Sequence, residues 1–151
     1  MFRGISNLSL DAKGRFAMPT RYRESLAAQC NGELIITIDI EERCLVIYPM
    51  PVWLEIERQI DALSGLNRKV SRIKRMLIGH ATEVSLDANG RLLVPPELRD
   101  HAGLTKGAVL VGQGKKFELW DEDTWRAARE AWLAGDEDEG EGPAALEQIA
   151  L

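Results

Sequence analysis

The chain has few of the residues on which catalytic, redox and metal sites usually depend. Among its 151 residues there are two cysteines and two histidines, and no Cys-x-x-Cys pair is present. Cys30 and Cys44 are isolated, so we expect free thiols rather than a disulfide or a metal site. His80 and His101 have no acid or cysteine at ligand spacing, and no glycine-rich phosphate loop of the Walker or dinucleotide type occurs. We therefore predict no enzyme, no cofactor and no metal.

Long hydrophobic runs are also missing. No apolar stretch of the sequence approaches the roughly 20 residues that a helix needs to cross a bilayer. The first residues, MFRGISNLSLD, lack the apolar stretch and small-residue cleavage site of a signal peptide. With 45% hydrophobic and 28% charged residues, the composition is typical of a globular protein. We expect no membrane contact and a cytoplasmic location.

Acidic residues outnumber basic ones, with a formal net charge of -5, but the two signs are separated along the chain. Residues 135–151 hold six of the 24 acidic residues and no Lys or Arg, which predicts a flexible acidic tail. The other 18 acidic residues are balanced by 19 basic ones. Basic residues gather in the first thirty residues and in residues 66–80, which contain no acid. Such local positive charge suits a protein that binds a polyanion through a patch.

A seven-residue motif occurs twice. Residues 9–15 are SLDAKGR and residues 85–91 are SLDANGR, an offset of 76 positions. The match extends to Arg23 and Arg99, with a proline at the same place in each copy. An internal repeat of this kind indicates one structural unit used twice. We predict four parts: a first repeat (1–63), a basic connecting helix (64–80), a second repeat (81–134) and the acidic tail (135–151).

The hydrophobic pattern predicts the same elements in both copies. Short alternating runs predict strands on both sides of each turn. Pro19 and Pro95 stand where a short helix would begin, and the second of these helices should end near Gly103. Further strands are predicted at 34–39, 44–48, 109–112 and 116–120. A closing helix in each copy has an apolar face that predicts packing on a core: Trp53, Ile56 and Ile60 in the first, and Trp125, Ala128 and Trp132 in the second.

Residues 66–78 predict an additional amphipathic helix between the copies. Its apolar stripe consists of Leu66, Val70, Ile73 and Leu77. Three arginines, Arg68, Arg72 and Arg75, fall on the opposite side. Two interpretations of this basic face stay open: it is simply solvated, or it follows a phosphate backbone.

The repeated motif has the residues of a three-residue hairpin loop, in which a type I turn is followed by a left-handed residue and the two flanking strands pair with each other. Gly14 and Gly90 can take the left-handed conformation without steric cost. Asp11 and Asp87 are placed to accept hydrogen bonds from turn N–H groups. Four residues after each Asp, an arginine falls across the loop, where an ion pair would fix its guanidinium.

Three interpretations of these turns are possible. The Asp–Arg pairs could be purely structural, although an exposed ion pair contributes only about 0 to 1 kcal/mol to stability. Each Asp could instead orient an Arg toward guanine edges or phosphates, both of which Arg binds bidentately. A catalytic aspartate dyad fails, because such a dyad needs Asp-Thr/Ser-Gly without basic neighbours. The first two interpretations are compatible and stay open on local grounds.

The opening MFRG and the doubled Asp-x-x-x-Arg motif, in LDAKGR and LDANGR with a proline at the same distance, resemble the MraZ family. These bacterial transcriptional regulators are related to AbrB-type DNA-binding proteins, and the resemblance covers residues 1–133. It implies an α+β fold: a swapped-hairpin β-barrel built from two tandem repeats in one chain, with helices packed outside. It also implies a ring-like homo-oligomer that binds repeated boxes in double-stranded DNA, in the promoter of its own division and cell wall operon.

Carried onto this chain, the resemblance predicts a nucleoid-associated repressor that contacts DNA through the two motifs. Arg15 and Arg91 would make the base or phosphate contacts, with Asp11 and Asp87 as orienting groups. At the tips of the turns, Lys13 carries a charge and Asn89 does not. Weaker candidates for backbone contacts are Arg3, Arg21 and Arg23. Two alternatives stay open: a ring-forming scaffold with a protein partner, and an AbrB-like antitoxin with a toxin partner.

Overall fold

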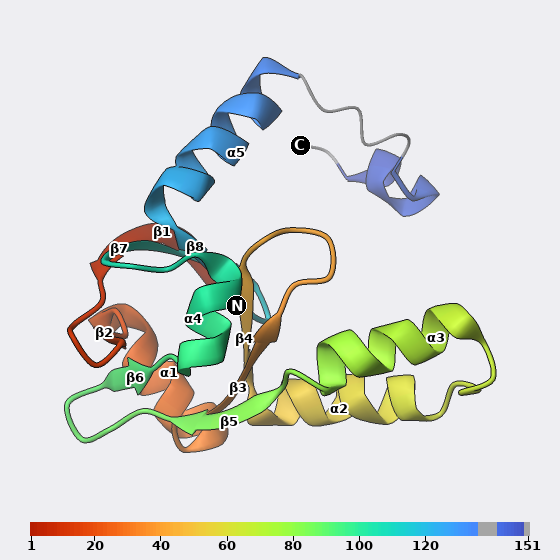
Figure 1. Cartoon of the computed structure of the whole chain (residues 1–151), viewed down its shortest axis with the longest axis horizontal. Coiled ribbons are helices and arrows are strands. Elements are labelled where there is room, and N and C mark those ends of the chain that lie inside the picture. Colours follow the sequence, from red (N-terminus) through yellow and green to blue (C-terminus); the bar gives the residue numbers. More distant parts are fainter. Residues whose placement is uncertain (136–141, 150–151) are drawn as a thin grey trace.

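The computed structural model describes residues 1–135 and 142–149, which form a mixed α+β fold with five α-helices (Figure 1). The strands are β1 (Phe2–Ser9), β2 (Arg15–Ala17), β3 (Glu33–Ile38), β4 (Leu45–Pro49), β5 (Thr82–Ser85), β6 (Arg91–Leu93), β7 (Gly107–Gly114) and β8 (Phe117–Asp121). The helices are α1 (Thr20–Cys30), α2 (Met50–Asp61), α3 (Arg68–Ile73), α4 (Pro96–Ala102) and α5 (Glu122–Ala134), with a π-helical turn η1 (Lys74–Ile78) and a 3-10 helix η2 (Ala144–Gln148). No helix within the described ranges is both long and apolar enough to cross a membrane.

The same order of elements occurs twice, but the strands of the two copies are interleaved. One antiparallel sheet has six strands in the order β1-β7-β8-β4-β3-β5, and β2 and β6 form a separate two-stranded ribbon. Strand β1 of the first copy pairs with β7 of the second, and β5 of the second copy pairs with β3 of the first. In the described residues no strand pairing joins the edge strands β1 and β5, so the six-stranded sheet is not closed.

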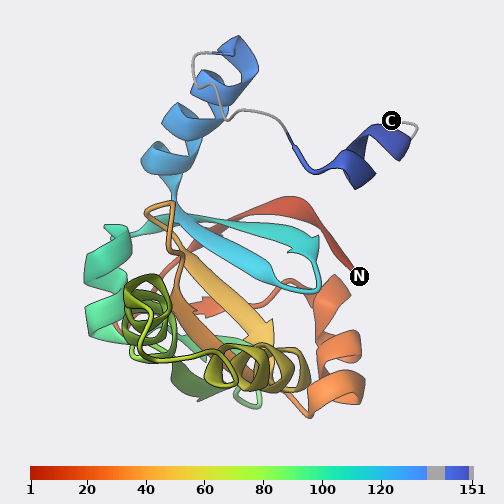
Figure 2. The same cartoon turned by 90° about the vertical axis from the view of Figure 1, so that its right-hand side faces the viewer.

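The prediction that strands lie on both sides of each turn is confirmed, but the idea that each turn closes a simple hairpin is wrong. Strand β2 pairs with β6, with Phe16 opposite Leu92, rather than with β1. Both of these side chains are buried, in a core that also receives Leu26 from α1 and Leu98 from α4. Each copy therefore completes its core with strands from the other. Figure 2 shows α1 and α4 on opposite flanks of the curved sheet.

The closing helices pack as their apolar faces predict. Trp53 of α2 is 1% exposed and its ring centroid lies 5.5 Å from that of Tyr48. Trp125, Ala128 and Trp132 of α5 pack against a smaller cluster around Trp120. Helix α4 ends at Gly103 in the left-handed conformation, also as predicted. The aromatic faces of these two helices are therefore packing surfaces.

The connecting helix differs from its prediction at the N-terminal end. It begins only at Arg68, because the Asn67 side chain caps it by accepting the N–H groups of Lys69 and Val70. Leu66 precedes this cap and is 96% exposed, so it does not belong to the apolar stripe. The helix continues as the π-turn, where Leu77 is buried beside Trp53.

Candidate nucleic-acid interface

The first turn is organised by one carboxylate. Asp11 Oδ1 accepts the backbone N–H groups of Lys13 at 3.0 Å and Arg15 at 2.9 Å, while Oδ2 accepts Arg15 Nε at 2.8 Å. The N–H of Gly14 donates to the Asp11 carbonyl at 2.9 Å, and Gly14 has φ 89°. The turn thus has the left-handed glycine and the Asp–Arg pair that the sequence predicts.

The second turn repeats this geometry. Asp87 Oδ1 accepts the N–H groups of Asn89 at 2.8 Å and Arg91 at 2.9 Å, and Oδ2 accepts Arg91 Nε at 3.1 Å. Gly90 has φ 73° and donates its N–H to the Asp87 carbonyl. The near-identical letters therefore fold into near-identical structures.

Both carboxylates remain ionised well below neutral pH. The backbone N–H of Arg15, with further help from its side chain and from the N–H of Lys13, lowers the pKa of Asp11 from 3.8 to about 2. The backbone N–H of Arg91 is the main cause of the lowered pKa of Asp87. Carboxylates that hold no proton at neutral pH cannot act as the protonated member of an aspartate dyad. Their chemistry here is to hold the arginines.

The paired arginines keep donors available to a ligand. The side chain of Arg15 is 27% exposed and that of Arg91 is 35% exposed. Each uses Nε on its aspartate, and no protein partner is recorded for the Nη groups within residues 1–135 and 142–149. A guanidinium held along one edge can donate from the other edge to a phosphate or a guanine.

The fold brings the two turns together at one end of the molecule (Figure 1). The N–H of Met18 donates to the Gly90 carbonyl and the N–H of Val94 donates to the Gly14 carbonyl, each at 2.9 Å. Across the β2–β6 ribbon, Arg15 faces Leu93 and Ala17 faces Arg91. The two arginines are therefore diagonal neighbours with Cα atoms about 7–8 Å apart, on the face opposite buried Phe16 and Leu92.

Two further arginines pack on the turns. Arg23 Nε donates to the Met18 carbonyl at 2.7 Å, and Arg99 Nε donates to the Val94 carbonyl at 3.0 Å. A Cβ atom on Gly14 would lie 2.5 Å from the Arg99 guanidinium, and one on Gly90 would lie 2.5 Å from that of Arg23. Each guanidinium thus covers the glycine of the other copy's turn. Sequence analysis predicts Arg23 only as a weaker candidate and misses Arg99, although the repeat aligns the two.

Two other candidate arginines lie away from the turns. Arg3 is paired with Gln113 in β1, six residues before Ser9, which is about 20 Å at the rise of a strand. Arg21 Nη2 donates to Ser6 Oγ at 2.6 Å, and its guanidinium lies 4.6 Å from the Tyr22 ring centroid. Arg21 therefore ties α1 to β1.

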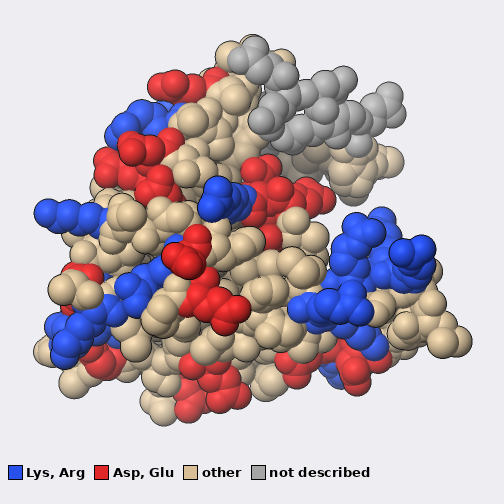
Figure 3. Space-filling model, in the orientation of Figure 1, with Lys and Arg blue, Asp and Glu red and all other residues tan. Residues whose placement is uncertain are grey.

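In Figure 3 lysines and arginines gather near the turns on the left and, separately, over α3 on the right.

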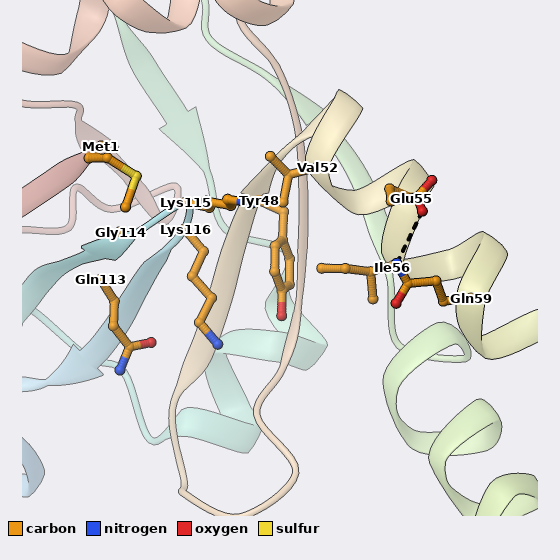
Figure 4. A pocket seen from close by; sticks show the side chains of 10 residues that line it. All are labelled: Met1, Tyr48, Val52, Glu55, Ile56, Gln59, Gln113, Gly114, Lys115 and Lys116. Carbon is orange, nitrogen blue, oxygen red and sulfur yellow. Dashed lines mark hydrogen bonds between the residues drawn. The ribbon is translucent and has the colours of Figure 1, made fainter. Parts of the chain in front are cut away.

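A cavity of about 540 Å³ lies between α2 and the β7–β8 turn, away from both motifs (Figure 4). Its lining is largely apolar, and Lys116 Nζ stands 5.7 Å from the centroid of the Tyr48 ring. Glu55, at its rim, is held by Arg58 and Gln59, which lower its pKa to about 2. Glu55 is thus held in an exposed ion pair with Arg58.

Fold and site together define a class: an α+β protein with two carboxylate-held arginine turns on one β-ribbon. A family described as "MraZ protein, putative antitoxin-like" matches residues 1–76 and again residues 77–136. Proteins named "Transcriptional regulator MraZ" are similar over the full length of both chains: 52% identical in Thioalkalivibrio sulfidiphilus, 54% in Halorhodospira halophila and 51% in Coxiella burnetii.

The chain belongs to the MraZ family. Its relatives are named transcriptional regulators, which agrees with the prediction of a DNA-binding regulator and confirms that the chain is not an enzyme. The resemblance based on the doubled motif is thereby confirmed.

Proposed function

We propose that the β2–β6 ribbon is the DNA-recognition surface of a sequence-specific regulator. A two-stranded ribbon fits the major groove of B-DNA, and arginine is the side chain that most often recognises guanine there. The observation that carries the proposal is the placement of Arg15 and Arg91 on the exposed face of the ribbon, each held by an aspartate at Nε. Asp11 and Asp87 act as the orienting groups.

Other cations near the ribbon would contact the DNA backbone. Lys13 is exposed at the tip of the first turn, where Asn89 occupies the second. Arg23 and Arg99 are each half-buried, with Nε committed to a backbone carbonyl, so they can meet a phosphate only with their Nη groups. Asn89 can donate only neutral hydrogen bonds to a phosphate. Arg3 would contact only a duplex that continues along β1.

We also propose the architecture that the MraZ resemblance implies. Exchange of strands between the copies supports a swapped-hairpin β-barrel, with the first repeat at residues 1–63 and the second at 81–134. Several subunits in a ring-like homo-oligomer would present several ribbons. Engagement of repeated boxes would then gain from the effective concentration of each further ribbon.

In the cell, we propose a nucleoid-associated cytoplasmic repressor of its own division and cell wall operon, acting at repeated promoter boxes. This proposal rests on membership of a family whose members are named transcriptional regulators. The antitoxin-like description of the family favours one second candidate, a toxin-binding role, and a ring-forming scaffold is the third.

Binding to the gene's own upstream region tests the proposal. Fluorescence anisotropy at fixed salt would compare this duplex with a scrambled one of equal length. Arg15→Ala and Arg91→Ala should each cost about 1–3 kcal/mol of specific binding, roughly 5- to 150-fold in Kd. Arg58→Ala, which removes one cation paired with Glu55 on α2, is the matched control and should bind like the parent.

Lysine variants separate base contact from phosphate contact. Arg15→Lys keeps the charge but loses the bidentate geometry, so a guanine contact would not be restored. Equal binding of the natural and the scrambled duplex would reject sequence-specific recognition and favour the scaffold or toxin-binding candidates.

A further inference from the structure

A second group of cations lies on the connecting helix, at the opposite end of the long axis from the turns (Figures 1 and 3). Arg68, Lys69, Arg72 and Arg75 are exposed, and within the described residues none has a carboxylate partner. The one recorded side-chain bond of the group joins Arg75 Nη2 to Ser71 Oγ at 3.5 Å. We call these four residues the α3 basic face.

Lys74, next to this face, differs from the four cations because it has partners within the protein. Lys74 is half-buried, donates to the Leu63 carbonyl at 3.3 Å and lies 3.9 Å from an oxygen of Asp61. It therefore serves the local structure. In the part of the chain that the structure describes, the four cations of the α3 basic face have no comparable ion pair or bond to the backbone.

The helix that carries this face is held firmly. Asn67 caps its first turn, and the buried Thr37 donates its hydroxyl to the Leu77 carbonyl at 2.7 Å. Ile73 and Leu77 pack into the cluster around Trp53, which turns the arginines away from the core. The cations are thus presented on a fixed surface rather than on a loose segment.

The spacing of the arginines suits a phosphate backbone. Arg68 and Arg72 lie four residues apart in α3, and Arg75 follows three residues later in the π-turn η1, so the three arginines follow one side of the connecting helix over about 10 Å. One strand of B-DNA advances about 3.4 Å along the duplex axis per phosphate, and its backbone also winds around that axis, so a row of this length with long side chains reaches two to three neighbouring phosphates. Arginine also binds phosphate bidentately and keeps its charge at all relevant pH values.

We propose that the α3 basic face binds the phosphate backbone of a second stretch of double-stranded DNA, outside the sequence that the ribbon recognises. The proposal rests on the proposed function only in taking DNA as the partner. Because the face and the turns lie at opposite ends of the molecule, contact with both requires DNA that bends around the protein or a second duplex.

The test uses the triple variant Arg68→Gln, Arg72→Gln, Arg75→Gln in the full chain. Two duplexes are compared: one that ends at the recognised boxes, and one extended on both sides by unrelated sequence. On the extended duplex, the slope of log affinity against log salt should be less steep than for the parent by about 2 to 3, the loss of about three phosphate contacts. On the short duplex, affinity and slope should match the parent.

A matched control removes the same charge elsewhere. The variant Arg58→Gln, Arg126→Gln, Arg129→Gln neutralises three exposed arginines of α2 and α5 and should bind both duplexes like the parent. An equal loss in this control would mean that net charge alone sets the affinity, and would overturn the proposal. Thermal unfolding of both variants should match the parent, since all six side chains are exposed.

Three other results would overturn the proposal. An unchanged salt slope on the extended duplex would leave the face solvated or bound to an acidic protein segment. An equal loss on both duplexes would assign the face to the recognised sequence itself. A changed subunit number by sedimentation would make it a contact between subunits. The parent and the triple variant can also be compared on a duplex of unrelated sequence alone. That comparison does not depend on sequence-specific recognition by the ribbon, so a failure of that recognition would be distinguished from a failure of this proposal.

Discussion

The two turns share a backbone and a pairing pattern but differ at their tips. In each, one carboxylate accepts two backbone N–H groups and the Nε of the arginine four residues later. The tip side chains, Lys13 and Asn89, are exposed and contribute only their backbone N–H to the turn. Asp, Gly and Arg are thus part of the turn's hydrogen bonding in both copies, while the tip side chain is not. The turn itself therefore does not need a charge at its tip.

The largest expected effects come from the buried face of the ribbon that carries both turns. Phe16 and Leu92 face each other across β2 and β6, at 1% and 0% exposure. Phe16→Ala should lower the free energy of unfolding by about 3–5 kcal/mol and Leu92→Ala by about 2–5 kcal/mol. Urea unfolding followed by circular dichroism measures both. Leu93→Ala, on the exposed face, is the control and should change it by less than about 0.5 kcal/mol.

The same experiment tests whether the copies depend on one another. Because β1 pairs with β7 and β5 with β3, we expect one unfolding transition, displaced as a whole by either substitution. Two transitions, of which Leu92→Ala displaced only one, would show that the copies unfold independently.

The next largest effects concern the glycines of the turns. Gly14→Ala and Gly90→Ala each force an alanine to adopt a positive φ. The new Cβ would press against the guanidinium of Arg99 in the first variant and of Arg23 in the second. Each should cost about 1–3 kcal/mol of stability. Gly65→Ala meets no atom within 4 Å and should be close to neutral. If the two turns are equivalent, the two losses should agree; a negligible loss at either position would contradict the packing of arginine on glycine.

The sequence predicted the turns almost completely, because their structure depends on contacts within five residues. Asp11, Gly14 and Arg15 determine one another, and periodicity was enough to place Trp53 in its core-facing stripe. The exchange of strands could not be predicted in the same way, since β2 can satisfy its hydrogen bonds with β1 or with β6. That choice is made by long-range packing, such as Phe16 against Leu92.

Among the residues around the turns, too, local features can be predicted from the sequence and long-range contacts cannot. Arg99 contacts Gly14, which is 85 positions earlier in the chain, and no local sequence pattern predicts such a contact. The repeat aligns Arg23 with Arg99 and so indicates that the two arginines have the same role. It does not indicate whether each arginine covers the glycine of its own turn or that of the other copy. The start of α3 was misplaced for a local reason: Asn67 is a strong N-cap, and it excludes Leu66 from the helix.

Acid should weaken the turns through their aspartates. The pKa of Asp11 falls from 3.8 to about 2 on folding, so its contribution to stability is complete above about pH 4 and is lost as the pH falls toward 2. The lowered pKa of Asp87 gives a loss of the same sign. Asp11→Asn should therefore flatten the dependence of the unfolding free energy on pH in this range, measured by urea unfolding at several pH values. If the unfolding free energy of Asp11→Asn depended on pH as steeply as that of the parent, Asp11 would be unpaired in solution.

Exchanging the tips should give the smallest and most specific effect. Lys13→Asn makes both tips neutral, and Asn89→Lys makes both charged, while neither change touches the hydrogen bonds of the turn. If each lysine contacts one phosphate, the slope of log affinity against log salt should become less steep by about 0.9 in the first variant and steeper by about 0.9 in the second. Stability should stay unchanged in both. A response to Lys13→Asn alone would mean that the two turns, though alike in structure, do not approach DNA alike, whereas opposite and equal shifts would establish that only the tip distinguishes them.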